Sequence, residues 1–485
     1  MGKYEYGHKK REGADWRGSG RAKMPTMRRR TPRRLLYLLS CILCVVYLFW
    51  TGHLPLLSIS TIRRIAVPTV QEKKGPHHHH HPHHYQDSGD IRCRGLPGAD
   101  DTVVVMKTGG TELAHKLPIH LNTTLRCYPN KIIFSDYEEV FLNEHIFDAL
   151  ESVNEVTKSL HPDFELWRRL RDGGGRRALR PHELSGQVSK VGSSFGKTDN
   201  PGWRLDKWKF LPIVNKTLSE WPNKKWYIFV ETDTFVHWQT LLNYLAALDH
   251  TQPYYIGGPM YIGDVQFAHG GTGFVISKPA LESVVSLFRG HQTEWEWFVN
   301  DFWAGDGVLG KAMVDSGTRL THAWPIFQGD DIGSVDWARN DGGRRLWCAP
   351  TASYHHLTPS VVEDLWRWEL DWMAQVDESQ AVLHHHDIYV MYLLPRIQQP
   401  RTNWDNHCND DQGPVLDLEE CRNICQRSRT CLQFSLSVDS RCLISQRPHL
   451  GEMVKGVESG WIVSRMEQFA REQHPCPRGR EAWIY

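Results

Sequence analysis

Two carboxylates two residues apart are the first candidates for chemistry in this sequence. Glu231 and Asp233 directly follow residues 226–230, an apolar run with the length and composition of a buried strand. Side chains at a strand end can face one divalent ion and a phosphate group, and hard oxygen ligands suit Mg²⁺ or Mn²⁺. Such an ion would neutralise a diphosphate leaving group. By itself, the acidic pair also fits a solvated turn, so both interpretations stay open at this point.

Three later segments carry further candidate residues. The first segment contains three glycines, Gly270, Gly271 and Gly273, which would let the backbone approach a ligand closely. Asp306 precedes an expected helix, where it could serve as a base or only cap the helix. His355 and His356 follow Tyr354 and offer imidazole nitrogens to a metal ion.

Strands that alternate with helices must position these residues. The apolar patterns predict buried strands at 102–106, 131–135 and 226–230, helices at 111–126, 140–160 and 203–214, and a surface loop at 171–177. Pro118 interrupts the first of these helices. This alternation predicts an α/β fold with a mostly parallel sheet and a ligand at the carboxyl ends of its strands. Thr108 and Asp136 follow the first two strands.

The order of these segments resembles glycosyltransferase family 31, which contains β-1,3-galactosyltransferases, fringe-like enzymes and core 1 synthase, and it looks closest to the fungal members. The resemblance covers about residues 91–395. It rests on the acidic strand end, the glycine-rich segment 270–277, the segment around Asp306 and the late pair Tyr354-His355. It implies a type II Golgi membrane enzyme with a GT-A fold, a Rossmann-like mixed sheet. It also implies a UDP-sugar donor, Mn²⁺ as cofactor and inversion at the anomeric carbon.

The resemblance also implies roles for individual residues. Asp233 matches the last Asp of the family's Asp-x-Asp motif and His355 its metal-binding His, so both would bind Mn²⁺. Glu231 stands where the family usually has Asp, and would hold a water ligand or the ribose. Asp306 matches the catalytic Asp that takes the proton from the acceptor hydroxyl. His356 has no match and is interpreted as structural.

Weaker expectations concern the donor and the acceptor. Lys209 lies upstream of the acidic strand, at a spacing like that of a family lysine near the donor. Thr108 and Asp136 are expected near the nucleotide, although surface or capping roles remain open for all three. The acceptor is expected beside the three glycines. Gly305 departs from the family, which often has Glu before the catalytic Asp.

The N-terminal region predicts a membrane anchor. Residues 1–34 hold 12 lysines and arginines against three acidic residues, and residues 35–57 are apolar without a charge. The positive-inside bias predicts a cytosolic tail at 1–34, a transmembrane signal anchor at 35–57 and a lumenal remainder, with a cleaved signal peptide as the alternative. Residues 58–90, with the tract HHHHHPHH at 77–84, are expected to form a low-complexity stem, unless the imidazoles bind a metal.

A lumenal location agrees with the sequons at Asn122 and Asn215 and with nine cysteines after the anchor. Because nine is odd, at least one thiol must lack a partner within the chain, and Cys93 is expected to pair with Cys127. The GT-A domain is expected at 91–400 and a disulfide-rich module at 401–466, followed by a tail at 467–485. Five cysteines crowd into 408–442, and a zinc site is the alternative to disulfides. Cys421, Cys425 and the segment around Trp461 resemble a PAN/Apple domain, which implies binding to proteins or carbohydrates.

Together these observations predict a transferase that moves a hexose, foremost galactose, from a UDP-sugar to a glycan or glycoprotein acceptor in β-1,3 linkage. The near-neutral total charge, 57 basic against 56 acidic residues, argues against a nucleic-acid partner. Whether copies of the chain associate stays open. The alternative is an inactive relative that binds glycans or chaperones a partner, because Glu231 and Gly305 depart from the family pattern.

Overall fold

The computed structural model describes residues 92–184, 200–376, 381–473, 475–476 and 483. All of them belong to one structural unit, Ser88–Tyr485. The predicted tail, membrane anchor and stem at 1–90 lie outside the described residues, as does part of the tail at 467–485. Among the helices that the structure describes, none is long and apolar enough to cross a membrane.

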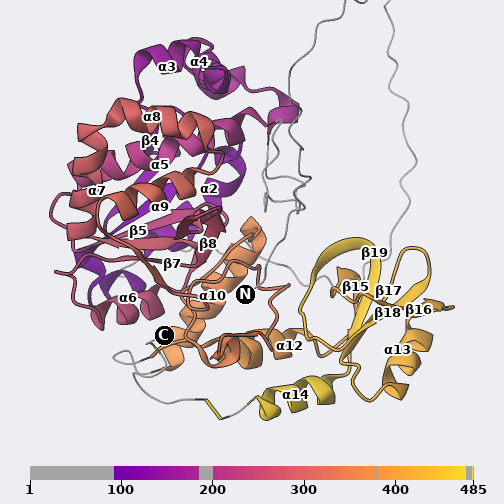
Figure 1. Ribbon diagram of the computed structural model, residues 1–485. Coiled ribbons are helices and arrows are strands. Elements are labelled where there is room, and N and C mark those ends of the chain that lie inside the picture. Colours follow the sequence, from indigo (N-terminus) through magenta and orange to yellow (C-terminus); the bar gives the residue numbers. More distant parts are fainter. Residues whose placement is uncertain (1–91, 185–199, 377–380, 474, 477–482, 484–485) are drawn as a thin grey trace, which may run out of the picture. The chain divides into compact units, whose positions relative to one another are not determined.

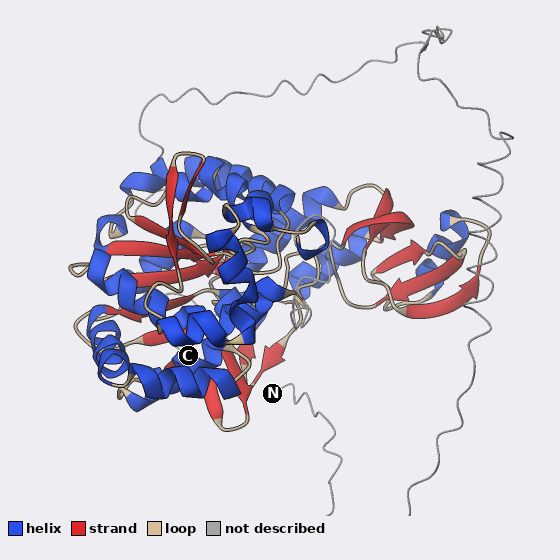
Figure 2. Ribbon diagram, turned by 90° about the horizontal axis from the view of Figure 1, so that it is seen from above, coloured by secondary structure: helices blue, strands red, loops and turns tan. Residues whose placement is uncertain are grey.

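A mixed sheet lies at the centre of the α/β region (Figures 1 and 2). In the described part of the chain it has eight strands, in the order β11-β7-β10-β5-β1-β2-β4-β3. These are β1 Thr102–Lys107, β2 Lys131–Ser135, β3 Glu139–Phe141, β4 Glu144–Asp148, β5 Trp226–Glu231, β7 Tyr255–Gly257, β10 Phe274–Ser277 and β11 Leu320–His322. The pairs made by β10, and the pair β3–β4, are antiparallel. The sheet therefore fits a GT-A fold and is less parallel than the strand–helix alternation alone predicts.

Strand β1 divides the apolar core into two layers. Val103 and Val105 pack into one cluster, whereas Val104 and Met106 pack into the other, because successive side chains of a strand point to opposite faces. The first cluster includes residues of α4 Glu165–Asp172, α5 Pro201–Glu220, α7 Lys278–Gly290, α8 Gln292–Asp301 and α9 Gly305–Asp315. The second includes residues of α2 Leu113–Asn122, α6 Trp238–Ala246 and α10 Pro359–Gln375. Helices thus cover both faces of the sheet (Figure 2).

The three predicted buried strands are confirmed, and so is the helix at 203–214, which extends over Pro201–Glu220. The helix predicted at 140–160 is wrong. This segment forms the hairpin β3–β4, a turn and the short helix α3, Glu155–Leu160. Leu142 and Asn143 adopt positive φ and reverse the chain, which lets Ile146 pair in parallel register with Ile133 of β2. Pairing at the sheet edge therefore prevails over an apolar spacing that fits a helix.

Two other boundaries differ from the sequence-based expectation. The helix predicted at 111–126 ends at Asn122, with Pro118 accommodated inside it, and a 3₁₀ turn follows at Thr124–Arg126. The loop predicted at 171–177 begins only at Gly173, because Arg171 and Asp172 still belong to α4.

Short elements after the large sheet complete the α/β region. Strand β6, Phe235–Val236, pairs with β14, Ser353–Tyr354. This pair brings the residue after Tyr354 close to the turn before Phe235. The remaining elements are the hairpin β8 Pro259–Ile262 and β9 Val265–Ala268, the pair β12 Asn340–Asp341 and β13 Arg344–Arg345, and the succession α11 His385–Asp387, π-helix Ile388–Leu393 and α12 Leu394–Arg396.

The C-terminal module is built on a second sheet, in the order β15-β19-β17-β18-β16. Its elements are β15 Arg401–Asp405, β16 Asp410–Pro414, α13 Leu418–Arg427, β17 Gln433–Leu436, β18 Arg441–Ser445, β19 Glu452–Trp461 and α14 Val463–Glu472, which crosses the expected boundary at 466. Cys421 and Cys425 lie one turn apart on α13, as predicted. They form disulfides with Cys442 and Cys431, so these four cysteines are not a zinc site.

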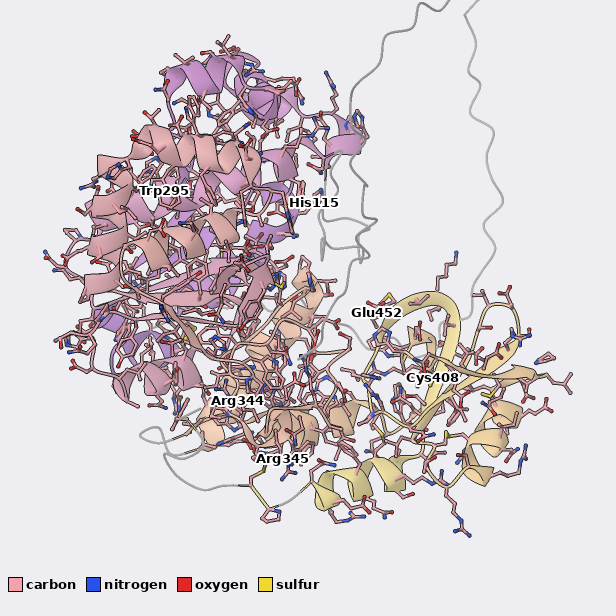
Figure 3. The ribbon with its side chains drawn as sticks, viewed as in Figure 1. His115, Trp295, Arg344, Arg345, Cys408 and Glu452 are labelled. Carbon is pink, nitrogen blue, oxygen red and sulfur yellow. A yellow bond between two sulfur atoms is a disulfide. The ribbon has the colours of Figure 1, made fainter. Side chains whose placement is uncertain are left out.

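Among the other cysteines, the one pairing that the sequence predicted is confirmed. Cys93 and Cys127 form the predicted disulfide, and Cys348 pairs with Cys476. Cys408 is the odd cysteine of the nine, and it is buried within the C-terminal module (Figure 3). Four disulfides in the described residues agree with an oxidising compartment.

Candidate active site

Asp233 is positioned by the buried end of β5. After Glu231 the chain turns, with the Thr234 amide donating to the Glu231 carbonyl at 3.1 Å. The buried His120 ring lies 2.9 Å from the Thr232 carbonyl, and the Thr234 hydroxyl donates to the Gly271 carbonyl at 2.7 Å. These contacts fix the turn, and they leave the Asp233 side chain only 8% exposed.

His355 reaches Asp233 through the pairing of β6 with β14. Tyr354 lies opposite Phe235 in this pair, so the residue after Tyr354 is brought to the turn that precedes Phe235. His355 Nε2 lies 3.2 Å from Asp233 Oδ1. Gly271 lies directly under the imidazole, and a Cβ at this position would collide with the His355 ring. The structure thus brings together the two residues predicted to bind the metal.

His356 joins this pair, although the sequence suggested only a structural role for it. Its backbone adopts a positive φ of 57°, and its ring centroid lies 3.7 Å from that of His355. One potential ligand atom from each of Asp233, His355 and His356 lies within 4.8 Å of the other two. The positive φ is the feature that turns two consecutive histidines toward the same point, and a sequence pattern does not reveal it.

The donor set of these three residues fits Mn²⁺. Asp233 Oδ1, both ring nitrogens of His355 and Nδ1 of His356 are buried and make no hydrogen bond. Buried polar atoms normally have partners, so a cluster of them points to a ligand. One carboxylate and two imidazoles are a set that Mn²⁺ accepts, with further positions for oxygen ligands from a diphosphate.

Lys116, on α2, determines the charge state of Asp233. Its Nζ lies 3.1 Å from Asp233 Oδ2 and 2.9 Å from Glu112 Oε2. Burial alone would raise the pKa of Asp233, but the charges of Lys116 and His355 outweigh it and hold that pKa well below its usual range. Asp233 therefore remains ionised at any physiological pH. No sequence pattern pointed to Lys116.

Asp306, in the first turn of α9, has the opposite electrostatic environment. Its carboxylate accepts hydrogen bonds from the amides of Gly270 and Gly307, both at 2.9 Å. Burial raises the pKa of Asp306 to about 6, and the negative charge of Glu231 adds to this effect. The helix-cap alternative is wrong, because Ala304 occupies the N-cap position. A carboxylate with a pKa near neutrality is suited to accept a proton.

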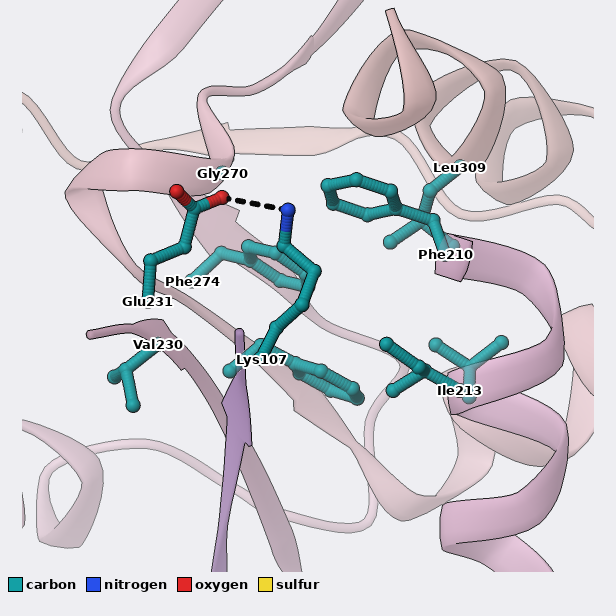
Figure 4. Close-up of a pocket in the computed structure, with 10 residues that line it drawn as sticks. Lys107, Phe210, Ile213, Val230, Glu231, Gly270, Phe274 and Leu309 are labelled. Atoms are coloured by element: carbon teal, nitrogen blue, oxygen red, sulfur yellow. Dashed lines mark ion pairs between the residues drawn. The ribbon is translucent and has the colours of Figure 1, made fainter. Parts of the chain in front are cut away.

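Lys107 binds Glu231 and was not identified from the sequence. Figure 4 shows its ammonium directed at Glu231, with Phe210 beside it. Lys107 Nζ lies 3.0 Å from Glu231 Oε1, 2.5 Å from Asp206 Oδ1 and 4.5 Å from the centroid of the Phe210 ring. Burial would lower the pKa of Lys107, but the two carboxylates raise it, so the ammonium stays charged. Lys107 thus fixes the Glu231 carboxylate, whose negative charge contributes to the raised pKa of Asp306.

Gly305 departs from the family pattern for a steric reason. A Cβ on Gly305 would collide with the Phe210 ring and with the backbone of Lys207 on α5. Helices α5 and α9 can pack this closely only if the position before Asp306 carries no side chain. The departure is therefore explained by packing and does not by itself indicate lost activity.

The three expected donor-binding residues outside β5 are engaged with one another. Lys209 Nζ lies 2.7 Å from the fully buried Asp136 Oδ1 and donates to the Thr108 carbonyl at 3.0 Å. Asp136 Oδ2 also accepts from the Gly110 amide at 2.6 Å. These bonds join the ends of β1 and β2 to α5, which is a structural role. Contact with the donor stays a prediction for all three.

The glycine-rich segment connects the two halves of the site. Gly270 donates to Asp306, Gly271 makes room for His355, and Gly273 has a φ of 73°, which few other residues adopt. The expected contact of these glycines with an acceptor stays a prediction, but their backbone holds Asp306 and His355, the residues predicted as base and metal ligand, at neighbouring positions.

Comparisons with known proteins agree with this site. Residues 211–312 match the family model described as Fringe-like. They include Glu231, Asp233, the glycine-rich segment and Asp306. A β-1,3-glucosyltransferase of Mus musculus is 27% identical over 182 residues, which cover 36% of this chain and 33% of that protein. These similarities support a Fringe-like glycosyltransferase region in the chain.

Proposed function

We propose that the protein is a Mn²⁺-dependent inverting glycosyltransferase that moves a hexose from a UDP-sugar to a glycan acceptor in β-1,3 linkage. The observation that carries this proposal is the joint placement of two carboxylates with opposite pKa shifts. Asp233 is held ionised beside two imidazoles, and Asp306 has a pKa of about 6. Asp306 accepts a hydrogen bond from the Gly270 amide, and the next residue, Gly271, makes room for the His355 ring beside Asp233.

Each of these groups has a task in an inverting transfer. Asp233, His355 and His356 would hold Mn²⁺, which supplies positive charge to the diphosphate of the donor. The oxygen of the acceptor hydroxyl bonds to the anomeric carbon, and a carboxylate oxygen of Asp306 takes the proton of that hydroxyl at the same time. The bond from this carbon to the diphosphate oxygen breaks on the opposite side, so the configuration inverts and UDP leaves.

Lys107 and Lys116 hold the two carboxylates at the donor side in place. Lys107 fixes Glu231, and Lys116 fixes Asp233 from α2. Each ammonium group is already paired with two carboxylates, so the positive charge that a diphosphate donor needs would have to come from the metal ion.

An aromatic pair supports a sugar as the acceptor. Trp303, three residues before Asp306, is 57% exposed and stacks on Trp203 with ring centroids 6.4 Å apart. Exposed aromatic rings offer apolar faces on which sugar rings can pack, with polar groups nearby to fix orientation. We therefore assign the acceptor to the glycan class, with the Trp303 face beside the base.

The donor sugar and the location extend the proposal further. Galactose is the hexose predicted from the sequence, and the name of the mouse relative adds glucose as the sugar to test beside it. The charge pattern of residues 1–57 supports a membrane anchor, the resemblance to glycosyltransferase family 31 implies the Golgi, and the four disulfides in the described residues are consistent with a lumenal location. The C-terminal module, if it is a PAN/Apple domain, would bring the enzyme to glycosylated acceptors.

The test is a UDP-release assay on the full chain with a panel of UDP-sugars, with Mn²⁺ or with a chelator. We expect release from a UDP-hexose that requires Mn²⁺ and rises when a glycan acceptor is added. Asp306→Asn should abolish most of the release, whereas Asp315→Asn, at the exposed far end of α9, should not. No release from any donor would reject the enzyme and favour the inactive, glycan-binding relative.

A further inference from the structure

A second group of metal-binding side chains lies at the start of α11, outside the site described above. His386 Nε2 is 3.1 Å from Asp387 Oδ1, and His384 Nδ1 is 3.4 Å from Asp387 Oδ2. One potential ligand atom from each of these three residues lies within 4.8 Å of the other two. Their side chains are about one quarter exposed, so an ion can reach them while most surrounding water is excluded.

The local backbone sets this arrangement. His384 is extended and precedes the helical turn His385–Asp387, and its amide donates to Asp387 Oδ2 at 2.9 Å. His385 points the other way, into the core, where its ring lies 2.8 Å from the Tyr354 hydroxyl and 2.9 Å from the Pro325 carbonyl. The central histidine anchors the turn, and the two flanking histidines meet over the same carboxylate.

A backbone carbonyl orients His386. Its Nδ1 lies 3.3 Å from the Trp347 carbonyl, which can only accept a hydrogen bond. Nδ1 therefore carries a hydrogen, which leaves Nε2, 3.1 Å from Asp387 Oδ1, as the ring atom that could bind a metal ion. Metal-binding histidines characteristically donate their other ring N–H to a carbonyl or carboxylate in this way.

An ion pair between His386 and Asp387 would explain one of these contacts, but it does not account for a second imidazole on the same carboxylate. The rings of His384 and His386 stack with centroids 5.2 Å apart. One divalent cation could bind both rings and the carboxylate together, because one ligand atom of each residue lies within 4.8 Å of the other two.

We propose that His384, His386 and Asp387 form a second divalent-metal site of the zinc class, separate from the Mn²⁺ group of the reaction centre. Two imidazoles, one carboxylate and one water make a tetrahedral set that suits Zn²⁺. The same residue types fit Mn²⁺ at the reaction centre only because a diphosphate there would add the oxygen ligands that Mn²⁺ prefers. The site does not depend on the proposed transferase activity.

The location indicates a structural task for this ion. His384 forms a β-bridge with Pro350, two residues after Cys348, whose disulfide to Cys476 holds the C-terminal segment. The same turn carries His385, which contacts Tyr354, the residue before His355. A metal on His384 and His386 would therefore rigidify the connection that supports His355 from behind.

Zinc content tests the proposal. The full chain is used with the histidine tract at 77–84 replaced by serines in every sample, since that tract could bind zinc itself. After dialysis, His384→Gln/His386→Gln should contain about one equivalent of zinc less than the parent, and should lose the rise in melting temperature on adding Zn²⁺. The matched control is His145→Gln, which removes an exposed histidine 2.9 Å from Glu138 and should keep the parent's zinc content. Equal zinc in parent and double variant would overturn the proposal.

A measurement on the parent alone covers the case in which the double variant does not fold. Diethyl pyrocarbonate modifies those unprotonated histidines that are accessible to it. Mass spectrometry then locates the modified residues. Zn²⁺ should protect His384 and His386 while His145 continues to react. If Zn²⁺ leaves the reactivity of His384 and His386 unchanged, the site is rejected, whatever the outcome of the transferase assay.

Discussion

The surroundings of Asp233 and of Asp306 are two regions of one site with opposite electrostatics. Asp233 is buried beside the cation Lys116 and the imidazole of His355, and its pKa falls. Asp306 is buried with amide donors and the nearby carboxylate Glu231, and its pKa rises to about 6. Burial acts in the same direction on both residues, so the neighbouring charges decide the sign.

Two aspartates of one site can therefore suit different roles, although their side chains are chemically identical. An ionised carboxylate without a proton to exchange is a suitable metal ligand, and one that titrates near neutrality is a suitable base. The glycine-rich segment keeps them distinct, since Gly271 serves the Asp233 side and Gly270 the Asp306 side. Five experiments test whether the two regions differ in this way.

The largest effect is expected from Asp306→Asn. The amide keeps the shape of the side chain but cannot take a proton, so turnover should fall by about 10²–10⁴. Calorimetry should find UDP–Mn²⁺ binding nearly unchanged. Asp315→Asn is the control on the same helix, where the carboxylate only pairs with Lys311. Turnover at the parent rate in Asp306→Asn would rule out the base assignment.

Asp233→Asn should fail differently. The amide oxygen still reaches the metal but brings no charge, so affinity for Mn²⁺ and for the UDP-sugar should fall together, each by about tenfold or more. Calorimetry with and without Mn²⁺ measures both. Asp249→Asn is the control, because this exposed carboxylate accepts hydrogen bonds only from its own turn. An unchanged Mn²⁺ affinity would contradict the metal-ligand role.

The pH dependence of turnover should report Asp306 and not Asp233. Below a pH of about 6 the Asp306 carboxyl is protonated and cannot act as a base, so turnover should fall about tenfold for each pH unit. Because the pKa is higher in the folded protein than in the unfolded chain, ionisation of Asp306 destabilises the fold as pH rises from 4 to 6. Asp306→Asn should therefore lose the acidic limb of the rate profile and melt at a higher temperature than the parent at pH 7. A parent profile that is flat between pH 5 and 7 would refute the pKa argument.

Substitution of the packed glycines should affect both regions through sterics. A methyl group on Gly271 meets the His355 ring, and one on Gly305 meets Phe210 and the Lys207 backbone. Each Ala variant should lose about 1–3 kcal/mol of unfolding free energy. Gly290→Ala is the control, because nothing lies within 4 Å of its added carbon. Gly271→Ala should also weaken Mn²⁺ binding, whereas Gly305→Ala should spare it, and chemical denaturation with calorimetry distinguishes the two.

The smallest effect is expected for Trp303→Ala. Loss of the ring should raise the KM for a glycan acceptor by about threefold to tenfold, with kcat and donor hydrolysis little changed. Trp297→Ala, which removes a 75% exposed ring from α8, is the matched control. Equal acceptor KM values in the two variants would remove Trp303 from the acceptor site.

Much of the fold could be predicted because the signals are local. The runs at 102–106, 131–135 and 226–230 each hold at least three consecutive apolar residues, which is typical of strands covered on both faces. The pairing of Cys93 with Cys127 also follows from their places before the first two strands. The helix predicted at 140–160 is wrong because the apolar residues of this segment fit a helix as well as strands. Pairing with β2 stabilises the strand.

The amino-acid sequence alone shows which residue types are available for catalysis and metal binding: the carboxylates at 231, 233 and 306, the histidine at 355 and the glycines that accompany them. Which of these residues lie close together depends on the tertiary structure. The β6–β14 pair brings His355 to Asp233 across more than a hundred residues, and α2 brings Lys116. It also decided the two pKa shifts, because a pKa depends on burial and on charges that are close in space, and neither is encoded in the spacing of residues along the chain.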